Sequence, residues 1–424
     1  MQNFKYKLYK MDPTVENDVK EIAKEVYSED LVRLRNELQM LKAGLSNKNR
    51  NLSRMNQYAV KYKKYKSARI QQASKKRDVI NKIMTKYPVL QHSDIMPYIE
   101  NAIIGPPEEV TLTIPAVYPK PTKSDMAVLL VYFNACSYKN LERNLRLTYM
   151  SLIDAEIPVF LVEHLFKDQE PIFPENGSTI FNTRSDSYMF YKENLLNWLM
   201  PRIPSQFTKF YMMDCDLIFS SPTWYDDVSA LLDTHDVVQP FQEAIWLKSD
   251  LNTILHKRIG FAYGHNLGHT LNLSKYHPGF AWAFRRDFIE PIGIFDLNVL
   301  GSGDTILASA ALQNYCIEEF WKMTNIEDDY KSTNNYINLF KNVRPTYYSN
   351  NMVYHLWHGS KLNREYNNRY TLFKQHCLKN NIFRYAELFE KNTYGIYEYK
   401  EYAREDLNNI LLDYFKSRDE DGIE

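Results

Sequence analysis

The stretch FYMMDCDLIFSS, residues 210–221, combines an apolar run with two carboxylates. The apolar side chains before Asp214 predict a buried strand, yet carboxylates are costly to bury unless something pairs with them. Side chains two residues apart in an extended segment point to the same side. Asp214 and Asp216 can therefore both face one divalent cation, such as Mn²⁺ or Mg²⁺. The alternative is a turn in which both aspartates accept hydrogen bonds from backbone amides.

Further apolar runs precede this one at intervals typical of an alternating fold. The runs MAVLLVYF (126–133) and PVFLVEHLF (158–166) predict buried strands, whereas LERNLRLTYMSLIDAEI (141–157) and YMFYKENLLNWLM (188–200) have helical periodicity. Strands that alternate with helices predict an α/β domain with a mainly parallel sheet. In such sheets ligands bind beyond the carboxyl ends of strands. The two aspartates follow a strand at such an end, which favours the metal site over the turn.

The first 95 residues lack strand-like runs and predict a helical arm that resembles a coiled coil. Five leucines spaced three, four, three and four apart lie between Leu31 and Leu45, a spacing that needs a partner helix. That partner is either a second copy of the chain or the protein's own next helix, after a break near residues 44–51. From Arg54 to Lys86 basic residues dominate, with Asp78 as the only acid. This run is either a solvated face or a site for an anionic partner such as nucleic acid or a membrane surface.

Beyond the arm, the sequence predicts three more segments. Residues 96–123 are rich in proline and predict a linker. Residues 124–375 form the predicted α/β domain, and residues 376–424 a helical tail. The side chains through which we expect the tail to pack on the α/β domain are Ile410, Leu411, Leu412, Tyr414 and Phe415. The acidic end of the tail is expected to stay in solvent.

Composition sets few limits on function. Lys+Arg and Asp+Glu both number 52, so the net charge gives no indication of a partner. The cysteines Cys136, Cys215, Cys316 and Cys377 lie far apart, which argues against a zinc ribbon or a disulfide scaffold. No segment has the apolar core of a signal peptide or the roughly 20 apolar residues of a membrane span. A cytoplasmic location is therefore expected.

Four motifs along residues 123–370 resemble those of the nucleotide-sugar-dependent glycosyltransferases of the GT-A fold. They are, in the order of that family, DCD (214–216), HPGFAWAFRRDFIEPIGIFD (277–296), LGSGDT (300–305) and HLWHGSKLNREYNNRY (355–370). The first resembles the family's D-x-D element and the second its glycine–aromatic–basic segment. The third resembles its Trp-Gly-Gly-Glu-Asp loop without the tryptophan and the glutamate. The fourth resembles the late histidine of the β-1,4-galactosyltransferase-like and polypeptide GalNAc-transferase-like branch.

The resemblance implies a Mn²⁺ or Mg²⁺ ion and a nucleotide-sugar donor, with a UDP-sugar as the default. It implies Asp216 as a direct metal ligand, Asp214 as a contact to the ribose or to a metal-bound water, and a histidine as a further ligand. His355 and His358 compete for that role, because a separation of three residues in an extended segment puts them on opposite faces. We favour His358, since Gly359 and a polar run follow it.

The resemblance also implies a general base and further donor contacts. Inverting sugar transfer needs a carboxylate that takes the proton of the acceptor hydroxyl, and Asp304 matches that position. Its alternative role is an N-cap or first-turn acid of a helix. The remaining candidates for donor binding are Glu163, Arg184, Asp186, Lys192, Asn194, Gly279 and Arg285. Arg285 and Arg286 can equally be an exposed basic pair.

The sequence thus predicts a metal-dependent, hexosyltransferase-like enzyme that moves a sugar to a hydroxyl of a glycan, a protein or a nucleic acid. One alternative is a nucleotidyl- or phosphotransferase that uses the D-x-D carboxylates. It would need a third carboxylate, for which Glu163 is the only candidate, and a glycine-rich phosphate loop, which is missing. The other alternative is a scaffold or nucleic-acid-binding protein with a degenerate enzyme domain. The presence of both aspartates, His358 and Asp304 argues against degeneracy.

Overall fold

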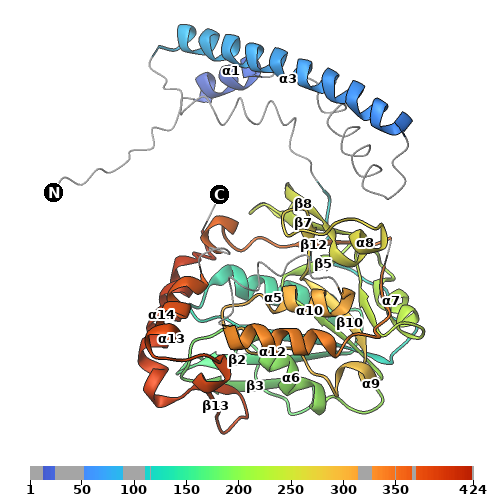
Figure 1. Cartoon of the computed structure of the whole chain (residues 1–424), viewed down its shortest axis with the longest axis vertical. Helices are drawn as coiled ribbons and strands as arrows, with labels where there is room; N and C mark the ends of the chain where they lie inside the picture. The colour runs from blue at the N-terminus through green and yellow to red at the C-terminus, as the bar shows by residue number, and fades with distance from the viewer. Residues whose placement is uncertain are drawn as a thin grey trace, which may run out of the picture. The chain divides into compact units, whose positions relative to one another are not determined.

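A computed structural model describes residues 13–23, 52–88, 110–114, 116–313, 327–348, 350–364 and 369–422. The chain divides into two compact units, Met1–Glu109 and Val110–Glu424. Both β-sheets with three or more strands belong to the second unit (Figure 1). The three cysteines described, Cys136, Cys215 and Cys377, are free thiols.

The first unit contains two described helices, α1 (Pro13–Ala23) and α3 (Leu52–Lys86). They pack together: Val19 of α1 and Ile83 of α3 are fully buried, and Lys86 Nζ lies 2.5 Å from Asp18 Oδ2. The helical prediction for the arm is confirmed over these two ranges. The leucine pattern in residues 31–45 and the break at residues 44–51 lie outside the described residues. Along α3, most described lysines are exposed, which agrees with a solvated face and equally with an anionic partner.

The central sheet of the second unit has seven strands in the order β11-β6-β10-β4-β1-β2-β3. Their bounds are β1 (Met126–Phe133), β2 (Val159–Phe166), β3 (Ile180–Ser185), β4 (Lys209–Met213), β6 (Val237–Gln239), β10 (Ala281–Arg285) and β11 (Pro345–Tyr347). The pairs are parallel except those made by β10, which runs antiparallel to β4 and β6. The prediction of an α/β unit with a mainly parallel sheet is confirmed.

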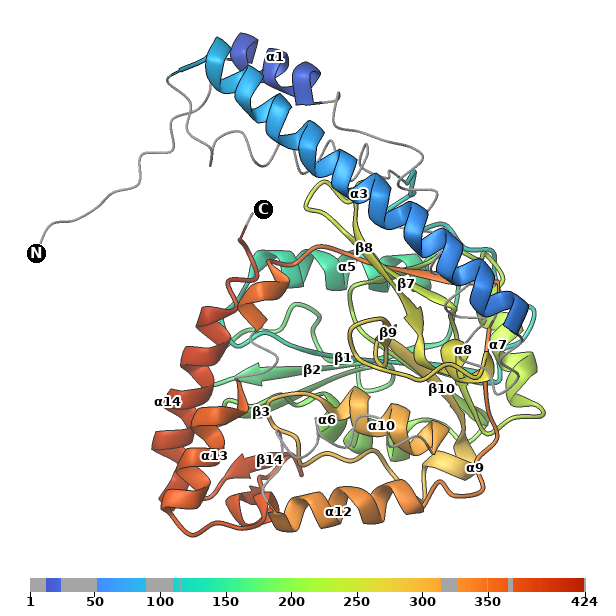
Figure 2. The same ribbon diagram turned by 45° about the horizontal axis from the view of Figure 1, so that its top comes forward.

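Helices cover both faces of the central sheet (Figures 1 and 2). One face carries α5 (Lys139–Ile153) and α7 (Trp224–Leu232), and the other carries α6 (Lys192–Leu199), α10 (Gly303–Leu312) and α12 (Glu327–Asn338). Successive side chains of β1 divide between the two apolar clusters. Leu129 packs with α6 and α10, whereas Leu130 packs with α5 and α7. Because both faces are covered, the strand is a continuous apolar run rather than an alternating one.

A second sheet of five strands has the order β5-β12-β7-β8-β9. Its strands are β5 (Leu217–Phe219), β7 (Glu243–Leu247), β8 (Ile254–Gly260), β9 (Tyr276–His277) and β12 (Met352–His355). The central strand β4 ends at Met213 and β5 begins at Leu217, so only the D-x-D tripeptide separates this strand of the central sheet from the first strand of the second sheet. Strand β12 pairs with β5, with His355 opposite Leu217. This junction brings the late histidine segment to the two aspartates.

The C-terminal region is helical, as predicted, and is part of the core. It contains α13 (Tyr370–Lys379), the short strands β13 (Phe389–Lys391) and β14 (Tyr397–Tyr399), and α14 (Glu401–Ser417). All five predicted packing residues of α14 contact the main apolar cluster; Leu411, Tyr414 and Phe415 are buried. The expectation of a solvated acidic end is wrong for Glu420, which is 2% exposed. After α14 the chain turns back toward α5, and this turn carries Glu420 into the interior.

Shorter elements complete the second unit. They are α8 (Phe261–Asn266), α9 (Arg286–Ile289), η2 (Met200–Arg202), η3 (Lys361–Arg364) and η4 (Tyr385–Leu388). The described part of the predicted linker lies against this unit: the amides of Val110 and Ala116 donate to Asn252 O (2.9 Å) and Ser151 Oγ (2.7 Å). Residues from Val110 onward therefore belong to the second compact unit.

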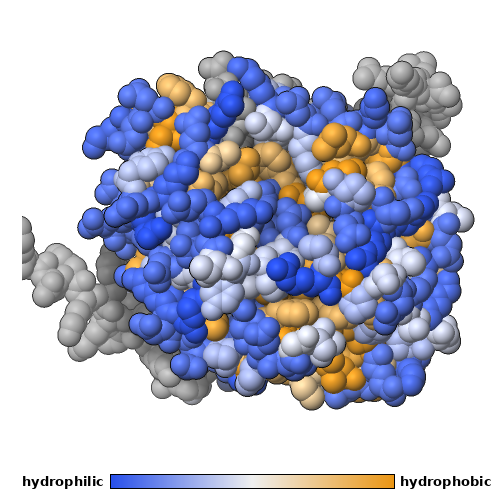
Figure 3. All heavy atoms as spheres, turned by 90° about the horizontal axis from the view of Figure 1, so that it is seen from below, coloured by the Kyte–Doolittle hydropathy of each residue, from blue (hydrophilic) through white to orange (hydrophobic). Residues whose placement is uncertain are grey.

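The surface and the helices of the described residues are largely polar. None of the described helices combines the length and the apolarity that crossing a bilayer requires. Figure 3 shows a mainly hydrophilic face with small, separate apolar areas. Isolated apolar side chains of this kind are normal on a protein surface and need no partner.

Candidate active site

Two backbone hydrogen bonds fix the D-x-D tripeptide at the carboxyl end of β4. The amide of Asp214 donates to Phe280 O (2.9 Å), just before β10. The carbonyl of Asp216 accepts from the amide of Leu356 (2.8 Å), just after β12. The tripeptide is thus held to the central sheet at one end and to the second sheet at the other, where the sequence predicts a ligand site.

Asp216 meets both histidines of the late motif. Its Oδ2 lies 2.9 Å from His358 Nε2 and 3.5 Å from His355 Nε2. The two Nε2 atoms are 3.1 Å apart, and the three side chains are the only described group of this kind that can hold a metal ion. The other oxygen, Asp216 Oδ1, is buried with no hydrogen-bond partner among the described residues. A buried polar atom without a partner costs about 1–3 kcal/mol of folding stability. A bound cation would satisfy this oxygen.

The donor set of this cluster fits a divalent transition metal. It offers one carboxylate and two imidazole nitrogens, all from side chains that are mostly buried. Imidazole suits transition metals, whereas Mg²⁺ prefers oxygen ligands. Of the two expected ions, Mn²⁺ therefore matches these residues better than Mg²⁺.

The expectation that His355 and His358 lie on opposite faces is wrong. Strand β12 ends at His355, so the two-residue alternation of a strand does not continue to His358. Gly359, with φ of +87°, then turns the chain. The ring of His355 stacks on Phe280 (centroids 5.0 Å apart), and both histidines reach Asp216.

The charges and the burial within the cluster shift the pKa values of its three members in different directions. Burial acts to raise the pKa of Asp216, but His355 and His358 hold it lowered, at about 2. Burial lowers the pKa of His355 well below its usual value, so its imidazole is neutral, the form that binds metals. For His358, burial also disfavours the charged form, but the Glu420 carboxylate outweighs it and raises the pKa.

Asp214 faces a different partner. Its Oδ1 lies 2.6 Å from Lys192 Nζ, which is also 2.8 Å from Asp304 Oδ1. Asp214 is thus paired with Lys192, whereas Asp216 alone of the two aspartates belongs to the group with the histidines. The strand ends at Met213, and the tripeptide is a turn in which strand alternation does not apply. Burial raises the pKa of Asp214 to about 7, against the pull of Lys192.

Asp304 lies in the first turn of α10, directly beside Lys192 and Gly279. A Cβ added to Gly279 would lie 2.4 Å from Asp304 Oδ2. Only glycine lets the backbone approach the carboxylate this closely. The predicted candidates Asp214, Lys192, Gly279 and Asp304 are thus brought together. Sequence analysis missed Glu193, which follows Lys192, lies against Gly303 and is 5% exposed.

Other donor-binding candidates have structural partners instead. Glu163 is 2% exposed and accepts hydrogen bonds from the amides of Ile172 (2.9 Å) and Phe173 (3.1 Å). Arg184 donates to the carbonyl of Gln169 (2.9 Å). Neither side chain lines the cavity described below. The structure therefore does not bring Glu163 and Arg184 to the cavity: both side chains hold the loop between β2 and β3.

Asp186, Asn194 and Arg285 also lie away from the cavity. The carbonyl of Asp186 accepts from Asn408 (2.8 Å), and Asn194 Nδ2 donates to Asp296 Oδ2 (3.2 Å). Arg285 pairs with Lys209 across the sheet, at the first residue of β4. Because β10 runs antiparallel to β4, its first residue rather than its last lies near Asp214. The structure therefore does not bring these three donor-binding candidates to the cavity.

A cavity of about 620 Å³ lies beside both carboxylate groups. Its aromatic lining includes Phe133, Tyr138, Phe190, Trp246 and Phe280. Its basic lining includes Lys192, Arg258, Arg364, Arg369 and Arg418. Arginines match the geometry of phosphate oxygens, and aromatic rings suit a base or a sugar face. Arg364 and Arg369 belong to the fourth motif, residues 355–370, whereas Arg258 and Arg418 lie outside all four motifs.

The comparisons with known proteins give only remote similarities. No family model and no curated protein matches the chain. Among solved structures, a 4-diphosphocytidyl-2C-methyl-D-erythritol synthase from Anaerococcus prevotii and a proposed glucose-1-phosphate thymidylyltransferase from Bacillus anthracis are each 10% identical, with TM-scores of 0.26. In both cases the match covers 53% of this chain and 86% of the other. A proposed nucleotide-diphospho-sugar transferase from Desulfovibrio desulfuricans is 10% identical, with 61% and 99% covered and a TM-score of 0.25. TM-scores this low carry no argument about this chain.

The first prediction concerns the metal. Asp216→Asn keeps the size of the side chain but removes its charge, so Mn²⁺ binding measured by calorimetry should weaken by about 100-fold or more; even residues that only orient ligands contribute about 10- to 100-fold. His355→Ala and His358→Ala should both weaken it, because both reach Asp216. Asp168→Asn, an exposed substitution of the same kind, should bind normally. An unchanged affinity in Asp216→Asn would exclude a metal at this cluster.

The second prediction concerns Glu193. Burial raises its pKa from 4.5 to about 8, so the folded chain keeps a proton that an unfolded glutamate releases. The stability that this group contributes is therefore complete below the pKa of a glutamate in the unfolded chain. It is lost as the pH rises through the pKa of Glu193 in the folded chain. Glu193→Gln should therefore gain stability relative to the unmodified chain between about pH 5 and about pH 8. Urea unfolding at several pH values, with Glu170→Gln as the exposed control, measures this. A pH-independent difference would contradict it.

Proposed function

We propose that the chain is a metal-dependent glycosyltransferase that moves a sugar from a nucleotide sugar to an acceptor hydroxyl. One observation carries the proposal. Asp216, His355 and His358 converge beside the cavity at the carboxyl end of β4, with Asp216 Oδ1 buried and unpartnered among the described residues. A divalent cation bound there supplies positive charge to offset the charge that grows on a leaving diphosphate.

The lining of the cavity supports a nucleotide-sugar donor. Arg364 lies at the metal cluster, with Nη2 3.0 Å from His358 Nε2, and Arg418 lines the same side. These guanidinium groups match the diphosphate. Phe190 also lines the cavity, and its ring stacks on Phe415 (centroids 5.2 Å apart). An aromatic ring suits a nucleobase, and UDP is the nucleotide we expect.

Asp304 is the base in this proposal. Among the described residues, its carboxylate is paired with Lys192, which also pairs with Asp214. Lys192 therefore links the base to the carboxylate that follows β4. The Asp304 carboxylate takes the proton of the acceptor hydroxyl as that oxygen attacks the anomeric carbon. The nucleoside diphosphate leaves from the opposite side, which inverts the configuration.

A panel of nucleotide sugars tests the class of reaction. The full chain is incubated with each donor, with and without Mn²⁺, and release of nucleoside diphosphate is measured. We expect Mn²⁺-dependent release from one donor, and faster release when the acceptor is present. A nucleotidyltransferase would instead release pyrophosphate from a nucleoside triphosphate and a sugar 1-phosphate. That result, or no turnover of any nucleotide sugar, would contradict the proposal.

The base has its own prediction. Asp304→Asn should lower kcat by about 10²- to 10⁴-fold, the usual contribution of a general base, while the Kd for the donor stays nearly constant. Asp168→Asn again serves as the exposed control. A collapse of donor affinity would mean that Asp304 holds the sugar or the loop instead. A product with retained anomeric configuration would exclude direct displacement.

A further inference from the structure

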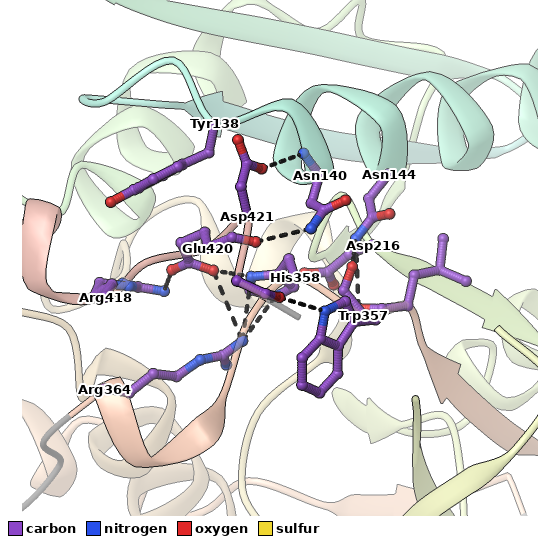
Figure 4. Close-up of polar contacts among 12 residues, drawn as sticks. Tyr138, Asn140, Asn144, Asp216, Trp357, His358, Arg364, Arg418, Glu420 and Asp421 are labelled. Atoms are coloured by element: carbon purple, nitrogen blue, oxygen red, sulfur yellow. Dashed lines mark hydrogen bonds and ion pairs between the residues drawn. The ribbon is translucent and has the colours of Figure 1, made fainter. Parts of the chain in front are cut away.

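The chain that follows α14 returns to the metal cluster. Glu420 Oε2 contacts His358 Nδ1, and the opposite ring nitrogen, Nε2, lies 2.9 Å from Asp216 Oδ2. Figure 4 shows His358 between these two carboxylates, with Arg364 and Arg418 extending toward Glu420. Glu420 is therefore not a metal ligand in this arrangement. It contacts the far side of a ligand ring.

The position of Glu420 is fixed by the residues next to it. The Asp421 carboxylate accepts hydrogen bonds from the amides of Lys139 (2.9 Å) and Asn140 (2.8 Å), the first residues of α5. An acceptor at a helix N-terminus is favourable, because those amides have no partner within the helix. Trp357 Nε1 donates to Gly422 O (3.1 Å). The segment is thus attached to α5 and to the residue before His358.

The histidine segment is shaped to receive this chain end. A Cβ on Gly359 would lie 2.6 Å from Asp419 O and 2.8 Å from Glu420 Cα. Gly359 is also in the left-handed region, at φ +87°, which suits glycine best. Arg143 Nη2 donates to Trp357 O (2.8 Å) and fixes the same segment from α5. Both sides of the contact between Glu420 and His358 are therefore held in place.

Burying Glu420 needs compensation, and its neighbours supply it. At 2% exposure, a lone carboxylate would be strongly unfavourable. Burial does act to raise its pKa, but Arg418 and His358 outweigh burial and lower it. A carboxylate can only accept, so a proton on His358 Nδ1 would be bound by Glu420. In that tautomer Nε2, which lies beside Asp216 and His355, is the atom offered to a metal.

We propose that Glu420 is a positioning residue of the metal site, which orients His358 and increases its strength as a ligand. The inference rests on the proposed function, because it assumes a divalent cation at Asp216, His355 and His358. Carboxylates that accept a hydrogen bond from a ligand histidine typically contribute about 10- to 100-fold to metal affinity. By linkage, a bound cation must also stabilise the docked form of the chain after α14.

Mn²⁺ binding to the full chain tests the role of Glu420. Free Mn²⁺ is titrated by electron paramagnetic resonance against the unmodified chain, Glu420→Gln and Glu420→Ala. Glutamine keeps the length of the side chain but not its charge, so we expect about 10-fold weaker binding for Gln and up to about 100-fold for Ala. The control is Glu405→Gln, the same substitution at an exposed site of α14. It should bind Mn²⁺ normally.

The melting temperature without metal separates positioning from folding. If Glu420 has only a structural role, its substitution would lower the melting temperature and leave the Mn²⁺ affinity of the folded variants unchanged. That result would overturn the inference. A second measurement needs no variant: hydrogen exchange at the amides of residues 418–422 should slow when Mn²⁺ is added, and equal exchange would also overturn it. If the unmodified chain binds and uses Mn²⁺ but Glu420→Gln does so equally well, only this inference fails. If the unmodified chain binds no Mn²⁺, the proposed function fails as well.

Discussion

The junction between the two sheets is the constraint on which the site depends. Three residues separate the central strand β4 from β5, and their backbone is bonded on one side to Phe280 and on the other to Leu356. These bonds leave the tripeptide little conformational freedom. They also set the distance from Asp216 to the end of β12, which carries His355. A change in the packing of either sheet would therefore directly change the distances between Asp216 and the histidines.

The site separates its charges into two groups. Lys192 neutralises two carboxylates, Asp214 and Asp304, at one side. At the other side Asp216 has two histidines as neighbours but still keeps one oxygen without a partner among the described residues. Buried polar atoms in proteins are nearly always satisfied. Asp216 Oδ1 is one of several such atoms among the described residues, and it belongs to the group with His355 and His358 at which we propose a cation. Asp214 is instead paired with Lys192.

The sequence predicts those features of the fold and the site that are caused by residues close together in the chain. Continuous apolar runs identify the buried strands, and the tripeptide after β4 identifies one end of the sheet. Arg285 was misassigned because its strand runs antiparallel, so the basic end of the motif points away from the site. His358 was favoured over His355 partly because strand alternation was assumed past the end of β12, which placed the two histidines on opposite faces. Glu193 and Glu420 carry no local signal, since their roles come from burial and from segments distant in the sequence.

The separation of the cluster's members along the chain has a consequence for how the protein folds. Asp216 and His358 are separated by more than one hundred residues, and His358 and Glu420 by a further 62. Contacts between such distant residues form late, because the entropy of closing long loops must first be offset. The central strands and helices can associate earlier through shorter loops. A cation bound at the proposed site would then meet its complete set of ligands only in the last stages of folding, after the scaffold around it is built.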